Sequence, residues 1–352
     1  MKSGNFLFSG LAFLIFVTAC QSTSPTPPVS VAPSGPWPTP GVSIVSIDAF
    51  PVMKPGAPGT WDDTDVLNPS VLEFGGSLLN HYSGYSHGLW STGTAVSRDN
   101  GSTWTRKGSP FLVSPPLSET VRYPIAANGS STVLSGQIYH LYERNRSDSN
   151  GDVSIWLATS RDGITWETSP GEVFAPSGVA GAFDETQVAD PYVITVGDSL
   201  YMFYTGVPRG AFKVLIGLAT SRDGIHWVRK AGPLINQGRP GYFDENIQGE
   251  PAVINTGPWW YMLYVGDTNT GFRSLGWASS ADGIRWTRQS TTDSIVPQDR
   301  RQAWFANMMI DPDFSRQAPN PDGTYTVYFG GGVRPGNQLI SGAIGRMTVR
   351  LK

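Results

Sequence analysis

Cysteine is almost absent from this chain, which has one cysteine among 352 residues. A single cysteine excludes an intrachain disulfide, so the fold must be held by its packed core. Charge is also scarce, because only 15% of the residues are Asp, Glu, Lys or Arg and the formal net charge is −3. Proteins that bind nucleic acid need a clustered excess of Lys and Arg to neutralise phosphates. We therefore expect no nucleic-acid partner.

Motifs that mark several other enzyme classes are missing as well. The sequence has no phosphate-binding loop, no Ser-His-Asp motif and no Cys/His spacing for zinc. His81 and His87 do not fall in a metal-ligand spacing, so we interpret them as exposed loop histidines. We predict no metal-ligating side chains and no cofactor, and leave open a structural or central ion such as calcium.

Aromatic residues, glycine and proline are abundant, with 12 Trp, 13 Tyr, 16 Phe, 41 Gly and 28 Pro. Sustained helical periodicity is absent, and this composition is typical of many short strands joined by tight turns. Two phrases alternate along the chain at intervals of about 60 residues, which indicates a repeat architecture. One resembles Ser-Arg-Asp-Gly-Ile-x-Trp and begins at Ser97, Ser160, Ser221 and Ser280. The other centres on a proline, at Pro69, Pro124, Pro191, Pro251 and Pro312.

Each repeat has room for four short strands, as the third repeat shows. Its strands are expected at 188–196, 200–205, 214–220 and from Trp227 onward. Four antiparallel strands per unit, repeated radially, predict an all-β, five-bladed β-propeller. We expect the strand at 42–46 to complete the fifth blade and close the ring. The five units are expected at 50–115, 116–178, 179–238, 239–300 and 301–352.

The N-terminal segment has the pattern of an export signal. Phe6–Val17 is an apolar run that is too short to span a membrane, so it is typical of a secretory signal. Val17-Thr-Ala-Cys20 resembles a bacterial lipobox, and this resemblance implies that Cys20 is lipidated and anchors the protein to a membrane. An ordinary signal peptide with an incidental cysteine is the alternative.

Three segments follow from this interpretation. We expect a lipoprotein signal peptide at 1–19, a Pro/Ser/Thr-rich linker at 20–41 and the propeller at 42–352. In a Gram-negative cell, Gln21 rather than Asp after the cysteine suggests the outer membrane. The protein is therefore expected to be an exported bacterial lipoprotein of the cell envelope, and a monomer.

The Ser-Arg-Asp-Gly-Ile-x-Trp phrases are interpreted as structural. Asp and Gly form the turn, the Asp side chain accepts backbone N–H groups, and Trp packs between blades. The first copy, from Ser97 to Trp104, matches the Asp box of sialidases, where this motif is likewise usually structural.

The residues before the repeated prolines are the candidates for chemistry. The first strand of each propeller blade lines the central axis, so these residues are expected to face one cavity. Converging carboxyl groups raise each other's pKa through repulsion and desolvation, which is what a general acid near neutral pH requires. The alternative is that Asp-Pro simply begins a strand. The five residues are Asn68, Tyr123, Asp190, Glu250 and Asp311.

Two phrases carry a family resemblance that covers nearly all of residues 50–350. Asp190-Pro-Tyr-Val-Ile with Tyr-Met-Phe-Tyr-Thr-Gly, and Ile216-Gly-Leu-Ala-Thr-Ser-Arg-Asp-Gly-Ile, resemble the five-bladed propeller glycosidases of family 43 and the related family 32. These families include arabinanases, β-xylosidases and fructosidases. The resemblance implies a glycoside hydrolase that acts on an oligo- or polysaccharide. It also implies that Glu250 is the general acid and that Asp190 tunes its pKa.

The general base departs from the family pattern. Asn68 stands at the matching position, and an amide does not take a proton from water. Asp65 and Asp311 are therefore the candidate bases. Asn68, Arg122 and Tyr123 are candidate substrate-binding residues, although Arg122 could equally form an ion pair between blades.

Two other functions stay open at this point. Asn68 in place of a base also fits a non-catalytic propeller lipoprotein that binds carbohydrate. A phosphorolytic relative would need a basic phosphate pocket, for which Arg122 alone is thin support.

Overall fold

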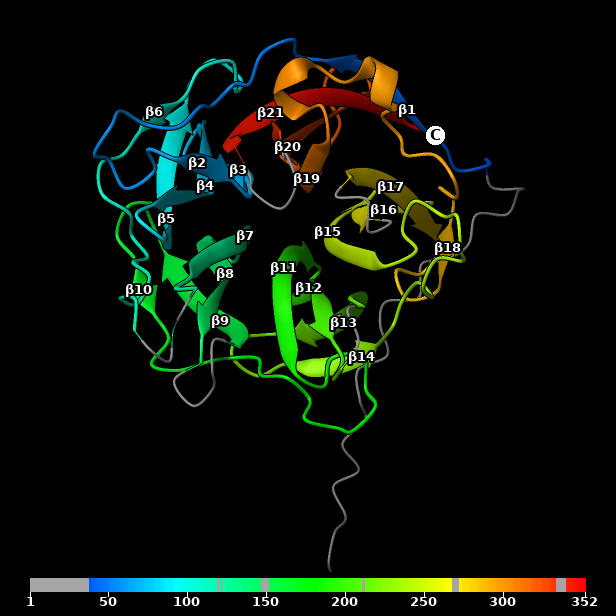
Figure 1. Ribbon diagram of the computed structural model, residues 1–352, viewed down its shortest axis with the longest axis horizontal. Helices are drawn as coiled ribbons and strands as arrows, with labels where there is room; N and C mark the ends of the chain where they lie inside the picture. Colours follow the sequence, from blue (N-terminus) through cyan, green and yellow to red (C-terminus); the bar gives the residue numbers. More distant parts are fainter. Residues whose placement is uncertain are drawn as a thin grey trace, which may run out of the picture. The chain divides into compact units, whose positions relative to one another are not determined.

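Five blades surround one central axis in the computed structural model of the protein, which is viewed end-on in Figure 1. The structure describes residues 38–118, 121, 123–146, 152–210, 213–267, 272–333 and 340–352. The arrangement confirms the predicted all-β, five-bladed propeller with four antiparallel strands per blade. In the described ranges, no helix is both long and apolar enough to span a membrane.

The strands of blades 1 to 3 follow one another from the axis outward. Blade 1 contains β2 (Asp65–Leu67), β3 (Val71–Phe74), β4 (Ser77–Ser86), β5 (Leu89–Ser97) and β6 (Thr105–Arg106). Blade 2 contains β7 (Ala126–Leu134), β8 (Gln137–Asn145), β9 (Val153–Ser160) and β10 (Glu167–Thr168). Blade 3 contains β11 (Gln187–Val196), β12 (Ser199–Val207), β13 (Leu215–Ser221) and β14 (Val228–Ala231).

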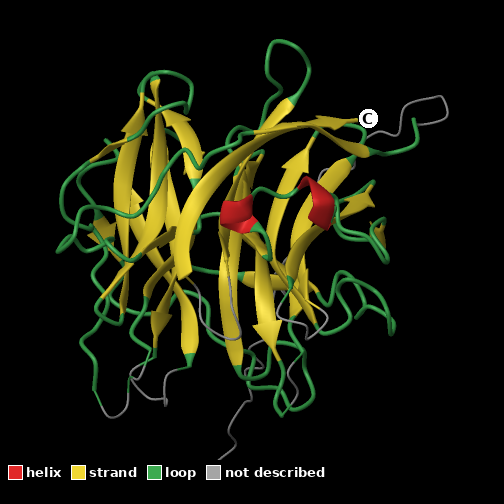
Figure 2. Cartoon of the chain, turned by 45° about the horizontal axis from the view of Figure 1, so that its top comes forward, coloured by secondary structure: helices red, strands yellow, loops and turns green. Residues whose placement is uncertain are grey.

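Blades 4 and 5 are joined by a single parallel pair between Arg273 and Met308. Two short 3-10 helices, η1 (Gln298–Arg300) and η2 (Ala303–Phe305), lie between these blades in the sequence and are drawn red in Figure 2. Blade 4 contains β15 (Ile247–Asn255), β16 (Trp260–Asp267), β17 (Arg273–Ser280) and β18 (Trp286–Arg288). Blade 5 contains β19 (Met308–Phe314), β20 (Tyr325–Val333), β21 (Ile340–Leu351) and the N-terminal strand β1 (Val42–Ile47).

The two ends of the propeller meet in blade 5. Strand β1 pairs antiparallel with β21, and Val42 lies opposite Leu351. The Gly41 and Lys352 backbones also exchange hydrogen bonds of 3.3 and 3.0 Å. The expected closure of the ring by the N-terminal strand is therefore confirmed.

The Ser-Arg-Asp-Gly-Ile-x-Trp turns have the structural role expected of them. In the third copy, Ser221 Oγ accepts the Gly224 N–H at 2.9 Å and donates to Asp223 Oδ1 at 3.0 Å. Gly224 has φ +76°, and a Cβ built on it would lie 2.8 Å from the Tyr139 ring of the preceding blade. Glycine is required here both by the left-handed backbone and by the close approach of the preceding blade.

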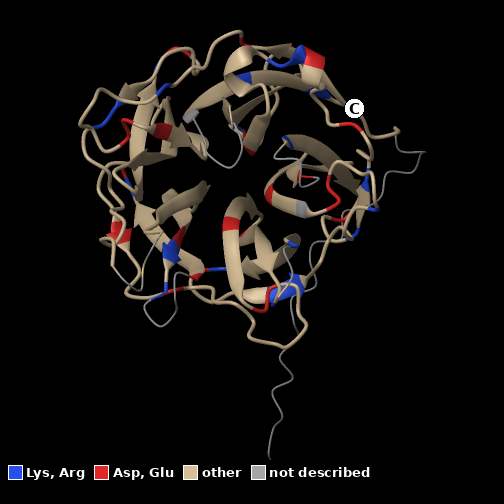
Figure 3. Ribbon diagram, in the orientation of Figure 1, with Lys and Arg blue, Asp and Glu red and all other residues tan. Residues whose placement is uncertain are grey.

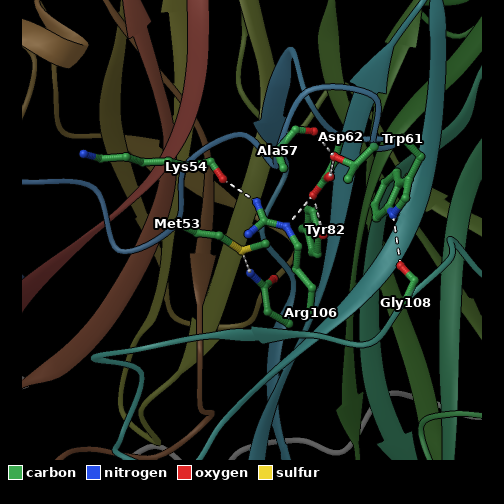
Figure 4. Close-up of polar contacts among 10 residues, drawn as sticks. Met53, Lys54, Ala57, Trp61, Asp62, Tyr82, Arg106 and Gly108 are labelled. Carbon is green, nitrogen blue, oxygen red and sulfur yellow. Dashed lines mark hydrogen bonds and ion pairs between the residues drawn. The ribbon is translucent and has the colours of Figure 1, made fainter.

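A second repeated unit ties the outer strands to the loop before each inner strand. In blade 1, the buried carboxylate of Asp62 accepts the Tyr82 hydroxyl at 2.7 Å and the Arg106 Nε–H at 2.6 Å (Figure 4). Arg106 also donates to the Lys54 carbonyl. The same unit recurs in blade 3 with Asp184, Tyr204 and Arg229, and in blade 4 with Asp244, Tyr264 and Arg288.

His81 does not match the interpretation as an exposed loop residue. It is 1% exposed on β4, between blades 1 and 2. Its Nδ1 lies 2.7 Å from Ser131 Oγ, which lies 2.8 Å from Nδ1 of the equally buried His140. Burial lowers the pKa of His81 to about 3, so the imidazole is a neutral core group. His87 is exposed, as expected.

We expect Asp62→Ala to lower the free energy of unfolding by about 1–3 kcal/mol, because it leaves the half-buried Arg106 guanidinium and the buried Tyr82 hydroxyl without their shared acceptor. Denaturant unfolding measures this loss. The exposed Glu167→Ala is the control and should change stability by no more than about 0.5 kcal/mol. A loss of the same small size in Asp62→Ala would show that the unit does not stabilise the blade.

Candidate functional site

One residue of each inner strand has a left-handed backbone, and these five residues form the ring of the candidate site. In blades 2 to 5, the ring residue and its successor lie opposite a single residue of the second strand, as in a β-bulge. In blade 1, the corresponding break separates β2 from β3. A non-glycine residue in this conformation is strained, and such strain is concentrated at functional sites. The ring residues are Asn68 (φ 47°), Asn128 (φ 49°), Asp190 (φ 44°), Glu250 (φ 51°) and Asp311 (φ 49°).

Each ring residue donates its backbone N–H to a side chain of the preceding blade. The ring is therefore hydrogen-bonded all the way round. The five bonds are Asn128 N to Ser83 Oγ (2.9 Å), Asp190 N to Glu143 Oε1 (2.6 Å), Glu250 N to Thr205 Oγ1 (3.1 Å), Asp311 N to Glu250 Oε2 (3.1 Å) and Asn68 N to Asp311 Oδ2 (3.3 Å).

The acceptors differ between blades because the second strands differ. The position that holds Ser83 in blade 1 holds Val265 in blade 4 and Gly330 in blade 5, and neither side chain can accept a hydrogen bond. There, the ring acids Glu250 and Asp311 take over the role. A Cβ built on Gly330 would lie 2.8 Å from Asp311 Oδ2, so the glycine leaves room for this carboxyl group.

The ring residues surround a cavity of about 40 Å³ at the centre of the propeller. Acidic segments of β11 and β15 border the axis in Figure 3. A second, larger cavity of about 330 Å³ follows along the inner strands, and Tyr192 and Asp313 line both. The cavity is lined by Asn68, Pro69, Asn128, Gly129, Ser130, Asp190, Pro191, Tyr192, Glu250, Pro251, Asp311, Pro312 and Asp313.

Burial and mutual repulsion raise the pKa of two ring acids. Burial and then the charge of Glu250 raise the pKa of Asp190 to about 6. The same two causes raise the pKa of Asp311 well above its ordinary value. Two residues after the ring acid Asp311, burial raises the pKa of Asp313 to about 8. The carboxyl group of Asp313 accepts the Val71 N–H at 2.9 Å, which opposes this rise. The cavity therefore holds both neutral and ionised carboxyl groups near pH 7.

Among the described residues, one guanidinium contacts a ring acid without lining the cavity. Arg273 Nη1 lies 3.2 Å from Glu250 Oε1, and its Nε lies 3.8 Å from Asp267 Oδ2. Glu250 thus faces two donors, the Arg273 guanidinium and the Asp311 backbone N–H.

The structure brings together four of the predicted site residues and separates the others. Asn68, Asp190, Glu250 and Asp311 line the cavity. Asp65 does not line it: its buried carboxyl group accepts the Gly342 N–H of β21 at 2.5 Å, at the seam between blades 1 and 5. Burial raises the pKa of Asp65, and the hydrogen bond from Gly342 opposes this rise.

The prediction that Tyr123 faces the cavity is wrong. Tyr123 is 81% exposed before the inner strand of blade 2, and Asn128 occupies the ring position. Asn128 is followed by glycine rather than proline, because a Cβ on Gly129 would lie 2.4 Å from His140 Nε2. Alignment on proline therefore selects the wrong residue in this blade. Arg122 and Cys20 lie outside the described residues.

Four residues near the cavity were missed by the sequence analysis. Asn128 could have been found from its spacing to the other ring positions, and Glu143 from its place one residue after the aromatic of the second strand. Asp313 follows the ring proline of blade 5, whereas Arg273 has no sequence signal that we can identify. In the described part of the chain, no group of three or more His, Cys, Asp or Glu side chains is arranged to hold a metal ion.

The fold of the chain is similar to that of solved carbohydrate-active enzymes. The β-1,2-mannobiose phosphorylase of Listeria innocua matches with a TM-score of 0.62 at 16% identity, over 86% of this chain and 96% of that one. The α-L-arabinofuranosidase PaAbf62A of Podospora anserina matches with a TM-score of 0.63 at 11% identity, over 86% and 95%. At these identities the similarity shows the fold alone.

No family model matches the sequence. The chain is 30% identical over 247 residues to uncharacterized protein Rv1502 of Mycobacterium tuberculosis (strain ATCC 25618 / H37Rv). The aligned residues cover 66% of this chain and 78% of that protein. The chain belongs to the same family as this mycobacterial protein. Uncharacterized protein MT1551 of strain CDC 1551 / Oshkosh is 29% identical over the same length.

Asp313→Asn should make stability less sensitive to pH. The pKa of Asp313 rises from 3.8 to about 8 on folding, so the advantage of its neutral form is complete below about pH 4 and is lost as the pH rises through 8. Asparagine stays neutral and can still accept the Val71 N–H. We expect the variant to gain a few kcal/mol over the wild type at pH 8 and little at pH 4, as measured by urea unfolding.

The matched control for this prediction is the exposed Asp293→Asn. It should leave the pH dependence of unfolding unchanged. Equal effects of Asp313→Asn at both pH values would show that folding does not raise the pKa of Asp313.

Proposed function

We propose that the protein hydrolyses glycosidic bonds of an oligo- or polysaccharide in the central cavity. The observation that carries this proposal is the convergence of Asp190, Glu250 and Asp311, from equivalent positions of three successive blades, on one cavity. The fold shared with sugar-cleaving enzymes supports it. Membership in glycosidase family 43 or 32 is part of the proposal.

Asp311 is the proton donor in this proposal. A general acid must hold its proton at the working pH, and burial together with the charge of Glu250 raises the pKa of Asp311 well above its ordinary value. Glu250, which the family resemblance suggested as the acid, instead accepts hydrogen bonds from Arg273 and from the Asp311 backbone. Its negative charge keeps Asp311 protonated, so Glu250 is the tuning residue.

Asp190 is the general base. Above its pKa of about 6 it is ionised and can take a proton from the water that attacks the anomeric carbon. Asp311 gives its proton to the glycosidic oxygen as that bond breaks. Asp190 and Asp311 lie on blades 3 and 5, with blade 4 between them. The proposed mechanism needs room for a water between the two carboxyl groups. Solvent then restores both protonation states.

Hydrolysis fits this site better than phosphorolysis. Phosphate as the attacking group would need free cationic side chains, and no Lys or Arg is among the described residues that line the cavity. The nearest guanidinium, Arg273, is already paired with acids. Product formation should therefore be independent of inorganic phosphate.

The first test is reducing-sugar release from a panel of plant and bacterial polysaccharides. We expect a pH profile whose acidic limb lies near pH 6, set by Asp190. Asp311→Asn should lower kcat about 10²–10⁴-fold, the usual contribution of general acid catalysis. Glu250→Gln should keep measurable activity but move the acidic limb to lower pH, because it removes the negative charge that raises the Asp190 pKa.

Two outcomes would change this assignment. Loss of activity at every pH in Glu250→Gln, with a mild effect of Asp311→Asn, would return the proton donor to Glu250. Binding of a glycan without turnover by the wild type would favour the alternative function, a carbohydrate-binding propeller. Asn68, which stands in the cavity where the family's base is expected, is the observation that favours this alternative.

The site is proposed to work at the cell envelope, because Val17-Thr-Ala-Cys20 resembles a lipobox. Cys20→Ser should move the protein from the membrane fraction to the soluble fraction of the cell envelope and abolish incorporation of radiolabelled palmitate. The conservative control Ser22→Ala should leave both unchanged. Membrane association of Cys20→Ser equal to that of the wild type would disprove the lipid anchor.

A further inference from the structure

Glu143 is a buried acid directly behind the ring, and the proposed mechanism does not use it. It lies on β8, is 4% exposed and does not line the cavity. Its Oε1 accepts the Asp190 N–H at 2.6 Å, and its Oε2 lies 3.4 Å from Asn128 Nδ2. The Glu143 and Asp190 side chains also form a hydrogen bond with each other.

The other blades show that this position does not need a carboxyl group for structural reasons. Ser83 and Thr205 occupy it in blades 1 and 3, and their hydroxyl groups accept the same ring N–H at 2.9 and 3.1 Å. A hydroxyl group is also cheaper to bury than a carboxyl group. The acid in blade 2, next to the blade that carries Asp190, therefore does something that a hydroxyl group does not.

Two carboxyl groups in contact in a buried site share one proton. Glu143 is the deeper of the two, whereas Asp190 reaches the cavity. Burial, followed by the charge of Asp190, raises the pKa of Glu143 well above its ordinary value. The shared proton therefore resides on Glu143, which can donate it as a hydrogen bond to the Asp190 carboxylate.

We propose that Glu143 is a positioning residue that holds a proton against the Asp190 carboxylate and so keeps Asp190 ionised and oriented as the base. The hydrogen bond opposes the charge of Glu250, which raises the pKa of Asp190, and acts together with the charge of Arg273, which lowers it. The contact between Glu143 and Asp190 stands independently of catalysis. Its effect on the reaction rests on the proposed function.

Two variants of Glu143 in the full-length chain test this proposal. Glu143→Gln keeps an acceptor for the Asp190 N–H and an N–H donor for its carboxylate, so the pKa of Asp190 should stay unchanged. Glu143→Met has a similar shape but cannot donate, so that pKa should rise by about one unit. The readout is the ¹³Cγ chemical shift of Asp190 in Asp-labelled protein as a function of pH, assigned with Asp190→Asn.

The alternatives give different results. If Glu143 were ionised in the wild type, Glu143→Gln would remove a negative charge and the pKa of Asp190 would fall by about one unit or more. If Glu143 only capped the backbone, Glu143→Met would leave the pKa unchanged. Either result overturns the proposal, and should Glu143→Met not fold, Glu143→Gln alone still separates a neutral from an ionised Glu143.

The titration needs no substrate, so it distinguishes this inference from the proposed function. Once a substrate is found, the acidic limb of the kcat profile should move to higher pH in Glu143→Met by the same amount as the titration, and KM should change little. An inactive protein with the expected titrations would reject the hydrolase and keep the Glu143–Asp190 pair.

Discussion

The structure depends on one requirement: the backbone N–H of each ring residue must find an acceptor in the preceding blade. A left-handed residue in a bulge cannot use its N–H within its own sheet, and a buried unpaired N–H is costly. Ser83, Glu143 and Thr205 meet this need from the second strands. These bonds, with those accepted by Glu250 and Asp311, tie the blades to one another at the axis.

In two blades, the second strand offers no side chain that can accept the ring N–H, and the acidity of the cavity follows from this. Val265 and Gly330 offer no acceptor, so Glu250 and Asp311 turn their carboxyl groups toward the next blade's N–H. Each acid is thereby held close to its neighbour and away from bulk water. The repulsion that raises the pKa of Asp311 is thus a consequence of how the ring is closed.

The repeat, the propeller and the three ring acids could be predicted from the sequence because the motifs behind them recur in several repeats. What the sequence could not reveal depends on single side chains that break the repeat. Gly129 replaces the expected proline because His140 fills the space of a Cβ, which hid Asn128. Asp65 is close to Asn68 in the chain, but its carboxyl group accepts a hydrogen bond from Gly342 of β21 at the seam between blades 1 and 5. The Glu143–Asp190 contact joins two blades, and no local pattern encodes it.

The pairing of β1 with β21 has a consequence for how the protein reaches its native state. Val42 and Leu351 lie at opposite ends of the propeller sequence, so their contact closes a loop as long as the domain itself. Contacts of such sequence separation form slowly, because the chain entropy must be lost before they are made. The first strand of the domain has no native partner until the last strand is present. An edge strand left open for that time is a site for wrong pairing, and this chain depends on keeping β1 unpaired until its partner arrives.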